Sequence, residues 1–235
     1  MKNQYFGDTR DLFTYDLAIE LLLTTPLKRY TFIPMLTPDD NPKEGQRTNF
    51  HRRHAGYMRK DLVDFLQRCV SRGERDIRKL EEFFDHLNRN IYGKRIELYI
   101  HRPEEFFDNS SREEYFSSIP STMLRDSLVF LDPDNGLEVK SFRGVKHLRY
   151  DELASIYDRS RDSVVKVFQF IPRVKRQEYF NTIGKRIMDA LGIERVIYIS
   201  DNQIVFFLLP KGVEVFPSVA RYARVYNLLY GEIAK

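Results

Sequence analysis

The sequence of 235 residues has little of several features that would restrict its function at once. Its single cysteine, Cys69, excludes an internal disulfide bond and any zinc site built from several cysteines. The longest apolar runs, such as Ile204 to Leu209, are only six or seven residues long, whereas a transmembrane helix needs about 20. The polar and acidic start, MKNQYFGDTRD, does not have the pattern of a secretory signal. We therefore expect a cytoplasmic protein without a membrane span.

Several well-known catalytic and phosphate-binding motifs are also missing. The sequence has no G-x-x-x-x-G-K-[ST] and no G-x-G-x-x-G, so it has no glycine-rich phosphate cradle. It has no G-x-S-x-G nucleophile turn, and its five histidines do not follow the H-E-x-x-H spacing of a zinc-binding helix. These absences argue against the common classes of nucleotide-binding protein, serine hydrolase and zinc protease that carry such motifs.

The composition is that of a globular protein with a slight excess of positive charge. Hydrophobic residues make up 42% and aromatic residues 14% of the chain, which easily supplies a core. The 38 basic and 34 acidic side chains give a net charge of +4. The length predicts a single domain over residues 1–235, of the α/β class by its alternating helical and extended patterns, and the charge permits nucleic acid as a partner without requiring it. They leave the oligomeric state open.

Helical and extended patterns alternate along the chain, which favours a sheet with crossover helices. The apolar periodicity predicts helices over residues 11–23, 57–90 with a break near 71–73, 112–118, 150–158, 174–191 and 213–230. It predicts six strands, over residues 30–36, 95–100, 127–131, 163–171, 195–199 and 203–209.

The last two predicted strands flank Ser200-Asp201-Asn202, a spacing typical of a hairpin. A series of parallel strands that ends in an antiparallel hairpin predicts a doubly wound mixed sheet. Methyltransferases that use S-adenosylmethionine have this ending, with seven strands. Residues 58–90 are where the sequence leaves room for the missing strand.

Acidic and polar residues gather where predicted strands end. Asp132, Asp134 and Asn135 follow a buried strand, and ligands of doubly wound sheets lie beyond the carboxyl ends of the strands. The alternative is a plain turn, because the segment 132–136 consists of turn-forming residues. Asp39 and Asp40 follow the first strand, where their carboxylates would hold a ribose or a metal ion, or would merely cap a helix or lie in a solvated loop.

The segment ahead of the first helix is unusual in its aromatic content. Asp8 fits an N-cap of that helix, with Asp11 in its first turn. The nearby Tyr5, Phe6 and Tyr15 also suit a segment that folds over a ligand. We expect residues 1–25 to pack over the site, and both interpretations remain open at this stage.

Basic residues cluster in loops on the expected ligand side of the sheet. Such a cluster is either the footprint of a phosphate backbone or a solvated surface balanced by acids elsewhere. The candidate nucleic-acid-binding residues are Arg47, Arg52, Arg53, Lys140, Arg143, Lys146 and Arg173.

Three short segments, 5–15, 36–40 and 130–138, look like a family of uncharacterised prokaryotic proteins. Its organisation resembles the J-type ribosomal RNA adenine methyltransferases, which belong to the Rossmann-like class that uses S-adenosylmethionine. Asp132-Pro133 is similar to the start of their D-P-P-Y motif, but Asp134 and Asn135 replace the second proline and the aromatic residue. Met35 to Asp39 replace the glycine-rich turn after the first strand, and Thr14 replaces a cofactor-site lysine.

The resemblance implies a methyltransferase-like protein that binds S-adenosylmethionine and acts on RNA or DNA. The polar groups at the reacting centre would be Asp132, Asp134 and Asn135. The residues around the cofactor would be Tyr5, Asp8, Asp11, Tyr15, Thr37, Asp39 and Asp40. The alternatives are a magnesium- or manganese-dependent nuclease or other phosphoesterase, using Asp132, Asp134 and one of Asp39 or Asp40, and a non-catalytic nucleic-acid-binding module.

Overall fold

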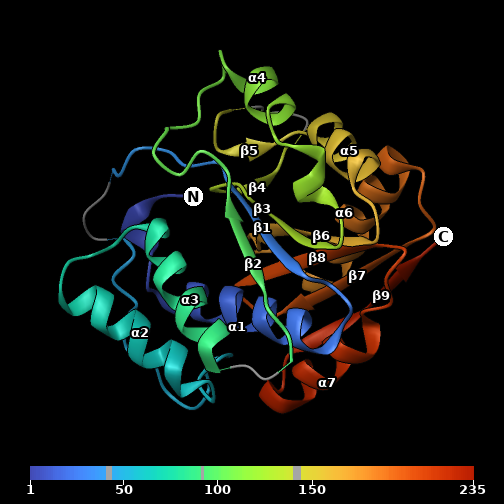
Figure 1. Ribbon diagram of the computed structural model, residues 1–235. Coiled ribbons are helices and arrows are strands. Elements are labelled where there is room, and N and C mark those ends of the chain that lie inside the picture. The colour runs from blue at the N-terminus through green and yellow to red at the C-terminus, as the bar shows by residue number, and fades with distance from the viewer. Residues whose placement is uncertain (41–43, 91–92, 140–143) are drawn as a thin grey trace.

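The computed structural model describes residues 1–40, 44–90, 93–139 and 144–235 (Figure 1). Its centre is a seven-stranded mixed sheet with the order β2-β1-β3-β6-β8-β7-β9. The strands are β1 (Arg29–Pro34), β2 (Glu97–Ile100), β3 (Ser127–Asp132), β6 (Ser163–Phe170), β7 (Arg195–Ser200), β8 (Ile204–Lys211) and β9 (Leu229–Ala234). The doubly wound mixed α/β fold expected from the sequence is confirmed, including the antiparallel β7–β8 hairpin.

Helices cover both faces of the sheet. The α-helices are α1 (Thr9–Thr24), α2 (Lys60–Ser71), α3 (Leu80–Asn90), α4 (Arg112–Ser117), α5 (Tyr150–Arg159), α6 (Arg176–Leu191) and α7 (Phe216–Tyr226). Helices α1, α2, α3 and α7 lie on one face, and α4, α5 and α6 lie on the other (Figure 1). Alternate residues of the buried strands therefore enter two separate hydrophobic cores.

The chain reverses direction across the sheet between β1 and β3. Strand β2 pairs in parallel with one side of β1, and β3 pairs in parallel with the other. Strand β6 then continues in parallel from β3. In sheets of this kind, the crevice at the carboxyl ends of the strands, where the strand order reverses, is the usual place for a ligand.

Local sequence signals account for the ends of several helices. Asp8 is the N-cap of α1, and its carboxylate accepts hydrogen bonds from the backbone N–H groups of Arg10 and Asp11 at 2.8 and 3.0 Å. The cap expected from the sequence is therefore confirmed. Helix α6 ends at Gly192, whose φ of 67° lies in the left-handed region that glycine adopts easily.

The predicted final helix was wrong beyond Tyr226. Asn227 has a φ of 53°, which ends α7 with a left-handed residue. Residues 229–234 then form β9, antiparallel to β7. Residues 58–90, the proposed place for a missing strand, contain α2 and α3, so the seventh strand lies instead at the other edge of the sheet. The short parallel pair β4 (Gly136–Leu137) and β5 (His147–Leu148) was not predicted from the sequence.

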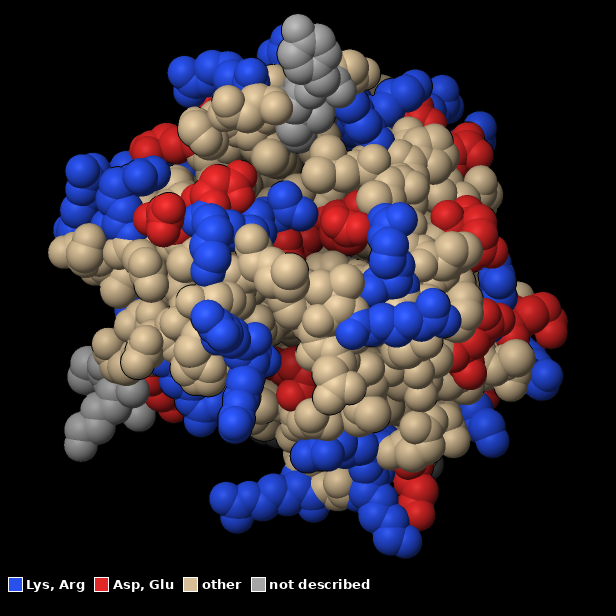
Figure 2. All heavy atoms as spheres, turned by 90° about the horizontal axis from the view of Figure 1, so that it is seen from below, with Lys and Arg blue, Asp and Glu red and all other residues tan. Residues whose placement is uncertain are grey.

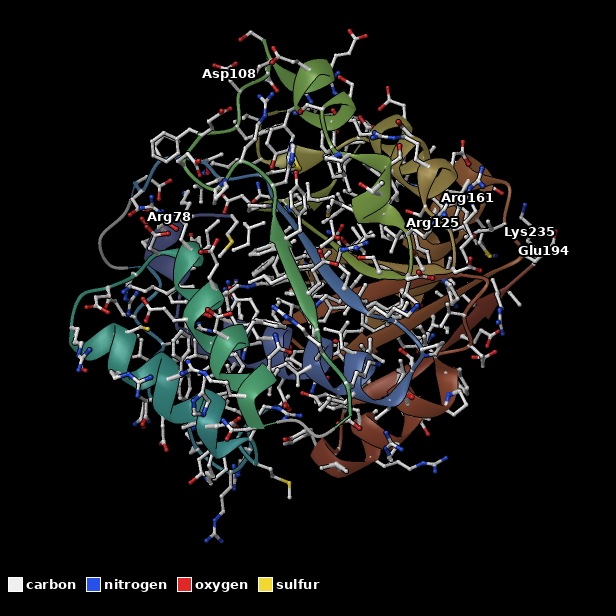
Figure 3. The ribbon with its side chains drawn as sticks, in the orientation of Figure 1. Arg78, Asp108, Arg125, Arg161, Glu194 and Lys235 are labelled. Atoms are coloured by element: carbon white, nitrogen blue, oxygen red, sulfur yellow. The ribbon has the colours of Figure 1, made fainter. Side chains whose placement is uncertain are left out.

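The amino ends of β3 and β6 lie next to each other, because the two strands are parallel neighbours in the sheet. Arg125 and Arg161 meet there in an isolated bridge, and Figure 3 shows them close together. Within the described residues, no helix combines the length and the apolar composition that crossing a bilayer requires.

Candidate functional site

A cavity of about 600 Å³ lies at the carboxyl ends of β3 and β6. Six parts of the chain form its walls: the N-terminal segment, the start of α1, the loop after β1, the turn after β3, Lys146 just before β5, and the end of β6. The lining residues are Met1, Lys2, Tyr5, Asp8, Arg10, Asp11, Thr14, Asp40, Glu44, Gly45, Gln46, Arg47, Asp132, Pro133, Asp134, Asn135, Lys146, Phe168 and Phe170.

Much of the predicted site converges on this cavity. The lining of the cavity includes the three predicted acidic or amide residues at the carboxyl end of β3, four of the predicted cofactor residues and two of the predicted basic residues. These are Asp132, Asp134 and Asn135; Tyr5, Asp8, Asp11 and Asp40; and Arg47 and Lys146. Residues 133–135 also form a turn, between β3 and β4, as the composition of the segment predicted, so the two interpretations are compatible.

Other predicted residues lie outside the cavity lining. Tyr15 is buried behind it and its hydroxyl donates to Asp11 Oδ2 at 3.3 Å. Thr37 is buried against Met1, and Asp39 is exposed, with Oδ1 accepting from the backbone N–H of Gln4 at 3.0 Å. Arg52, Arg53 and Arg173 are exposed away from the lining. Lys140 and Arg143 lie outside the described residues.

Three buried carboxyl groups form the acidic wall. Burial raises the pKa of Asp132 to about 6, although the Met1 amine and Lys166 oppose the shift. Burial also raises the pKa of Asp8, and burial together with the charge of Asp8 raises the pKa of Asp11 well above its usual range. Carboxyl groups with such raised pKa values are suited to proton transfer near neutral pH or to holding a cation that replaces the proton.

Lys166 on β6 is a buried cation close to this acidic wall. Its side chain is fully buried, and Nζ donates to the backbone carbonyl of Thr14 at 2.9 Å. Nζ also lies 4.0 Å from the ring centroid of Phe130 and 4.6 Å from that of Phe206. Burial lowers the pKa of Lys166 to about 7, against the attraction of Asp132 and Asp11. The ammonium group and the acidic wall therefore influence each other's protonation.

A second cluster of four charges lies in the cavity wall. Lys2 Nζ contacts Asp40 and lies 3.6 Å from Asp134 Oδ2. Lys146 Nζ lies 3.3 Å from Asp40 Oδ2 and 3.4 Å from Asp134 Oδ2. We call Lys2, Asp40, Asp134 and Lys146 the lysine–aspartate cluster. It joins the N-terminal segment to both the loop after β1 and the turn after β3.

The N-terminal segment closes the end of β1. The Met1 amine donates to the backbone carbonyls of Met35 at 2.9 Å and Asp132 at 3.3 Å. The backbone N–H of Thr37 donates to the carbonyl of Met1 at 2.8 Å. The backbone groups at the end of β1 are thus occupied by the N-terminal segment of the protein itself.

The acidic side chains that the structure describes do not form a metal cage. Within residues 1–40, 44–90, 93–139 and 144–235, no three His, Cys, Asp or Glu side chains are placed to hold one metal ion. Two of the carboxylates proposed for magnesium, Asp40 and Asp134, contact lysines instead.

Sequence reasoning missed Lys2, Arg10, Lys166 and Phe170. Lys166 occurs within a buried strand, SVVKVFQF, and a charged residue in such a run was a signal that could have been used. Phe170 ends the same strand and is 42% exposed, with the Arg10 guanidinium 5.2 Å from its ring centroid. Lys2 carried no comparable signal.

The sequence matches no protein-family model and no curated protein. Among solved structures, it is similar to a crystal structure of a Legionella pneumophila protein described by the family model DUF519. The match has a TM-score of 0.42 and 10% sequence identity, and it covers 97% of each chain. A similarity this weak does not indicate a shared activity.

Proposed function

We propose that this protein is methyltransferase-like, binds S-adenosylmethionine in the acidic cavity and acts on nucleic acid. The observation that carries the proposal is the convergence of Asp8, Asp11 and Asp132 on a cavity at the carboxyl ends of a doubly wound sheet. The cavity volume of about 600 Å³ is within the usual range for small-molecule sites.

The side chains of the cavity complement the charges of this cofactor. S-adenosylmethionine carries a sulfonium cation, an ammonium group and a carboxylate. The three buried carboxyl groups suit the two cationic centres. Arg10 Nε is buried at the wall without a hydrogen-bond partner, which suits the carboxylate. When bound, the cofactor would supply an electrophilic methyl group.

The N-terminal segment at the end of β1 limits where the cofactor can bind. Because Met1 occupies the backbone groups of Met35 and Thr37, the open space is over β3 and β6. Binding there would use side-chain carboxyl groups in place of a glycine-rich backbone turn. This matches the absence of such a turn from the sequence.

Basic and aromatic groups at the cavity support a nucleic acid as the substrate. Arg47 and Lys146 belong to the lining, and Phe170 offers an exposed ring on which a base would stack. On the face that carries α1, α2, α3 and α7, Lys and Arg side chains are also interspersed with Asp and Glu, so charge alone does not distinguish the two sides, and Phe170 favours the cavity side (Figure 2). Nucleic acid is therefore proposed to approach the cavity side, with Asp132, Asp134 and Asn135 contacting the reacting base.

Calorimetry with S-adenosylmethionine and S-adenosylhomocysteine tests the cofactor. The product lacks the methyl group and the sulfonium charge, so the acidic wall should favour S-adenosylmethionine. Asp11→Asn should weaken S-adenosylmethionine binding about tenfold and S-adenosylhomocysteine binding less. Asp64→Asn removes an exposed carboxylate from α2, away from the cavity lining, and should change neither affinity.

Transfer of a labelled methyl group to a panel of RNA and DNA tests the reaction. Incorporation that is lost in Asp132→Asn supports the proposal. Absence of heat with millimolar S-adenosylmethionine removes the cofactor from it. A salt-dependent gel shift without incorporation would indicate the non-catalytic binding module. The metal-dependent nuclease stays a hypothesis that no described contact favours, since lysines neutralise two of its carboxylates.

A further inference from the structure

The lysine–aspartate cluster combines two cations and two anions of unequal burial. The side chain of Lys2 is 2% exposed and that of Asp134 is 6% exposed. The side chain of Asp40 is 50% exposed and that of Lys146 is 38% exposed. The Asp134 carboxylate is therefore buried inside the wall, whereas the Asp40 carboxylate reaches the two ammonium groups from the solvent side.

Backbone contacts hold Asp40 in place without involving its carboxylate. Its backbone N–H donates to Gln4 Oε1 at 2.9 Å, and the neighbouring Asp39 carboxylate accepts from the backbone N–H of Gln4 at 3.0 Å. The Asp40 side chain can consequently rotate away from Lys2 and Lys146 while the loop keeps its attachment. Lys2 and Lys146 would then have only Asp134 as a shared counter-ion within the cluster.

We propose that Lys2 and Lys146 form a phosphate-binding site that Asp40 occupies in the free protein and vacates for a backbone phosphate of the nucleic acid. A phosphodiester carries one negative charge, so the exchange keeps the cluster neutral. Lysine ammonium groups are common phosphate partners. The phosphate site lies beside Asp134 and Asn135, which the proposed function places in contact with the reacting base. A phosphate bound there would therefore hold the nucleic-acid backbone next to that base. The inference names a contact of that substrate and rests on the proposed function for its biological role.

The test compares Asp40→Asn with Asp39→Asn. Both changes remove one negative charge from neighbouring loop positions, and an asparagine at 39 keeps the oxygen that accepts from Gln4. Affinities are measured for inorganic phosphate and for a short single-stranded oligonucleotide, and thermal unfolding verifies that each variant is folded. We expect Asp40→Asn to tighten both affinities about tenfold, which corresponds to about 1.4 kcal/mol, and Asp39→Asn to leave them nearly unchanged.

Lys146→Met provides the opposite perturbation at a partly exposed position. It should cancel the gain of Asp40→Asn and reduce the slope of log K against log salt for the oligonucleotide by about one. Tightening for inorganic phosphate alone would assign the site to a free phosphate and overturn the role in nucleic-acid binding. Equal effects of the two aspartate variants, or no effect of either, would overturn the site itself. Titration of the same variants with S-adenosylmethionine tests the proposed function separately, because phosphate binding does not require the cofactor.

Discussion

Replacing Lys166 by methionine should change how the stability of the protein depends on pH. Methionine has a similar length and keeps the packing against Phe130 and Phe206. It removes the buried ammonium group and its hydrogen bond to the Thr14 carbonyl. The substitution therefore tests whether a titrating charge lies beneath the acidic wall.

The expected size follows from the lowered pKa of Lys166. Burial lowers this pKa from 10.5 to about 7. Between these pH values the unfolded chain binds one more proton than the native protein, so the free energy of unfolding rises with pH. The contribution is about 1.4 kcal/mol per pH unit, or roughly 3 kcal/mol between about pH 7.5 and 9.5. Below about pH 7 Lys166 is charged in both states, and this contribution is absent.

Urea unfolding across that pH range measures the effect. The stability of the wild type relative to Lys166→Met should rise by roughly 3 kcal/mol over the two pH units. The Met1 amine, whose pKa burial also lowers, titrates in both proteins and so largely cancels in the comparison. Lys185→Met, at an exposed position on α6, controls for loss of a lysine. Parallel pH curves for the wild type and Lys166→Met would refute the reasoning.

Three further substitutions test the site and the fold. Asp132→Asn should raise the free energy of unfolding at pH 7 by at most about 3 kcal/mol. The pKa of Asp132 is about 6 in the native protein against an ordinary value of 3.8, so the wild type loses stability as the pH rises between these values. The difference between the two proteins should vanish below about pH 4 in acid unfolding curves. Asp16→Ala should cost about 3 kcal/mol in urea unfolding, because it removes the buried partner of Arg59. Gly184→Ala should be more favourable to the melting temperature in an Ile233→Val background than in the wild type. Its Cβ would lie 2.5 Å from Ile233 Cδ1, an atom that valine lacks, and without that clash alanine stabilises the interior of α6 by about 1 kcal/mol.

The sequence predicted most of the sheet because its inner strands are strongly apolar. Strand β3 is buried at every position, and β6 at all but its last residue, so a continuous apolar run was a sufficient signal. Strand β9 lies at an edge and buries only Ile233. Its sequence, LYGEIA, therefore lacked a strong period, and the preceding helical pattern was extended through it.

The acidic part of the candidate site was predictable for a topological reason. Asp132 is the last residue of a buried parallel strand, and strand ends at a reversal of strand order meet at one edge of the sheet. Asp8 and Asp11 were recognisable from their position at the start of a helix. No local pattern shows which distant cation reaches a given carboxylate. Lys166 stands out within its apolar strand, but its proximity to Asp132 and Asp11 is visible only in the folded chain. The same holds for the contact between Lys2 and Asp134.

The two groups of charges in the cavity suit different tasks because only the lysine–aspartate cluster has members that lie partly in solvent. Asp132, Asp11 and Lys166 are buried, and desolvation is the largest cause of the pKa shift of each. Such groups respond strongly to a charge brought into the cavity, which makes them suited to a small cationic ligand or to proton transfer. Asp40 and Lys146 lie partly in solvent, where an ion pair contributes little to stability and its members exchange partners at low cost. The buried group therefore fits the chemistry proposed for the cavity, and the lysine–aspartate cluster fits recognition of the substrate's backbone at its wall.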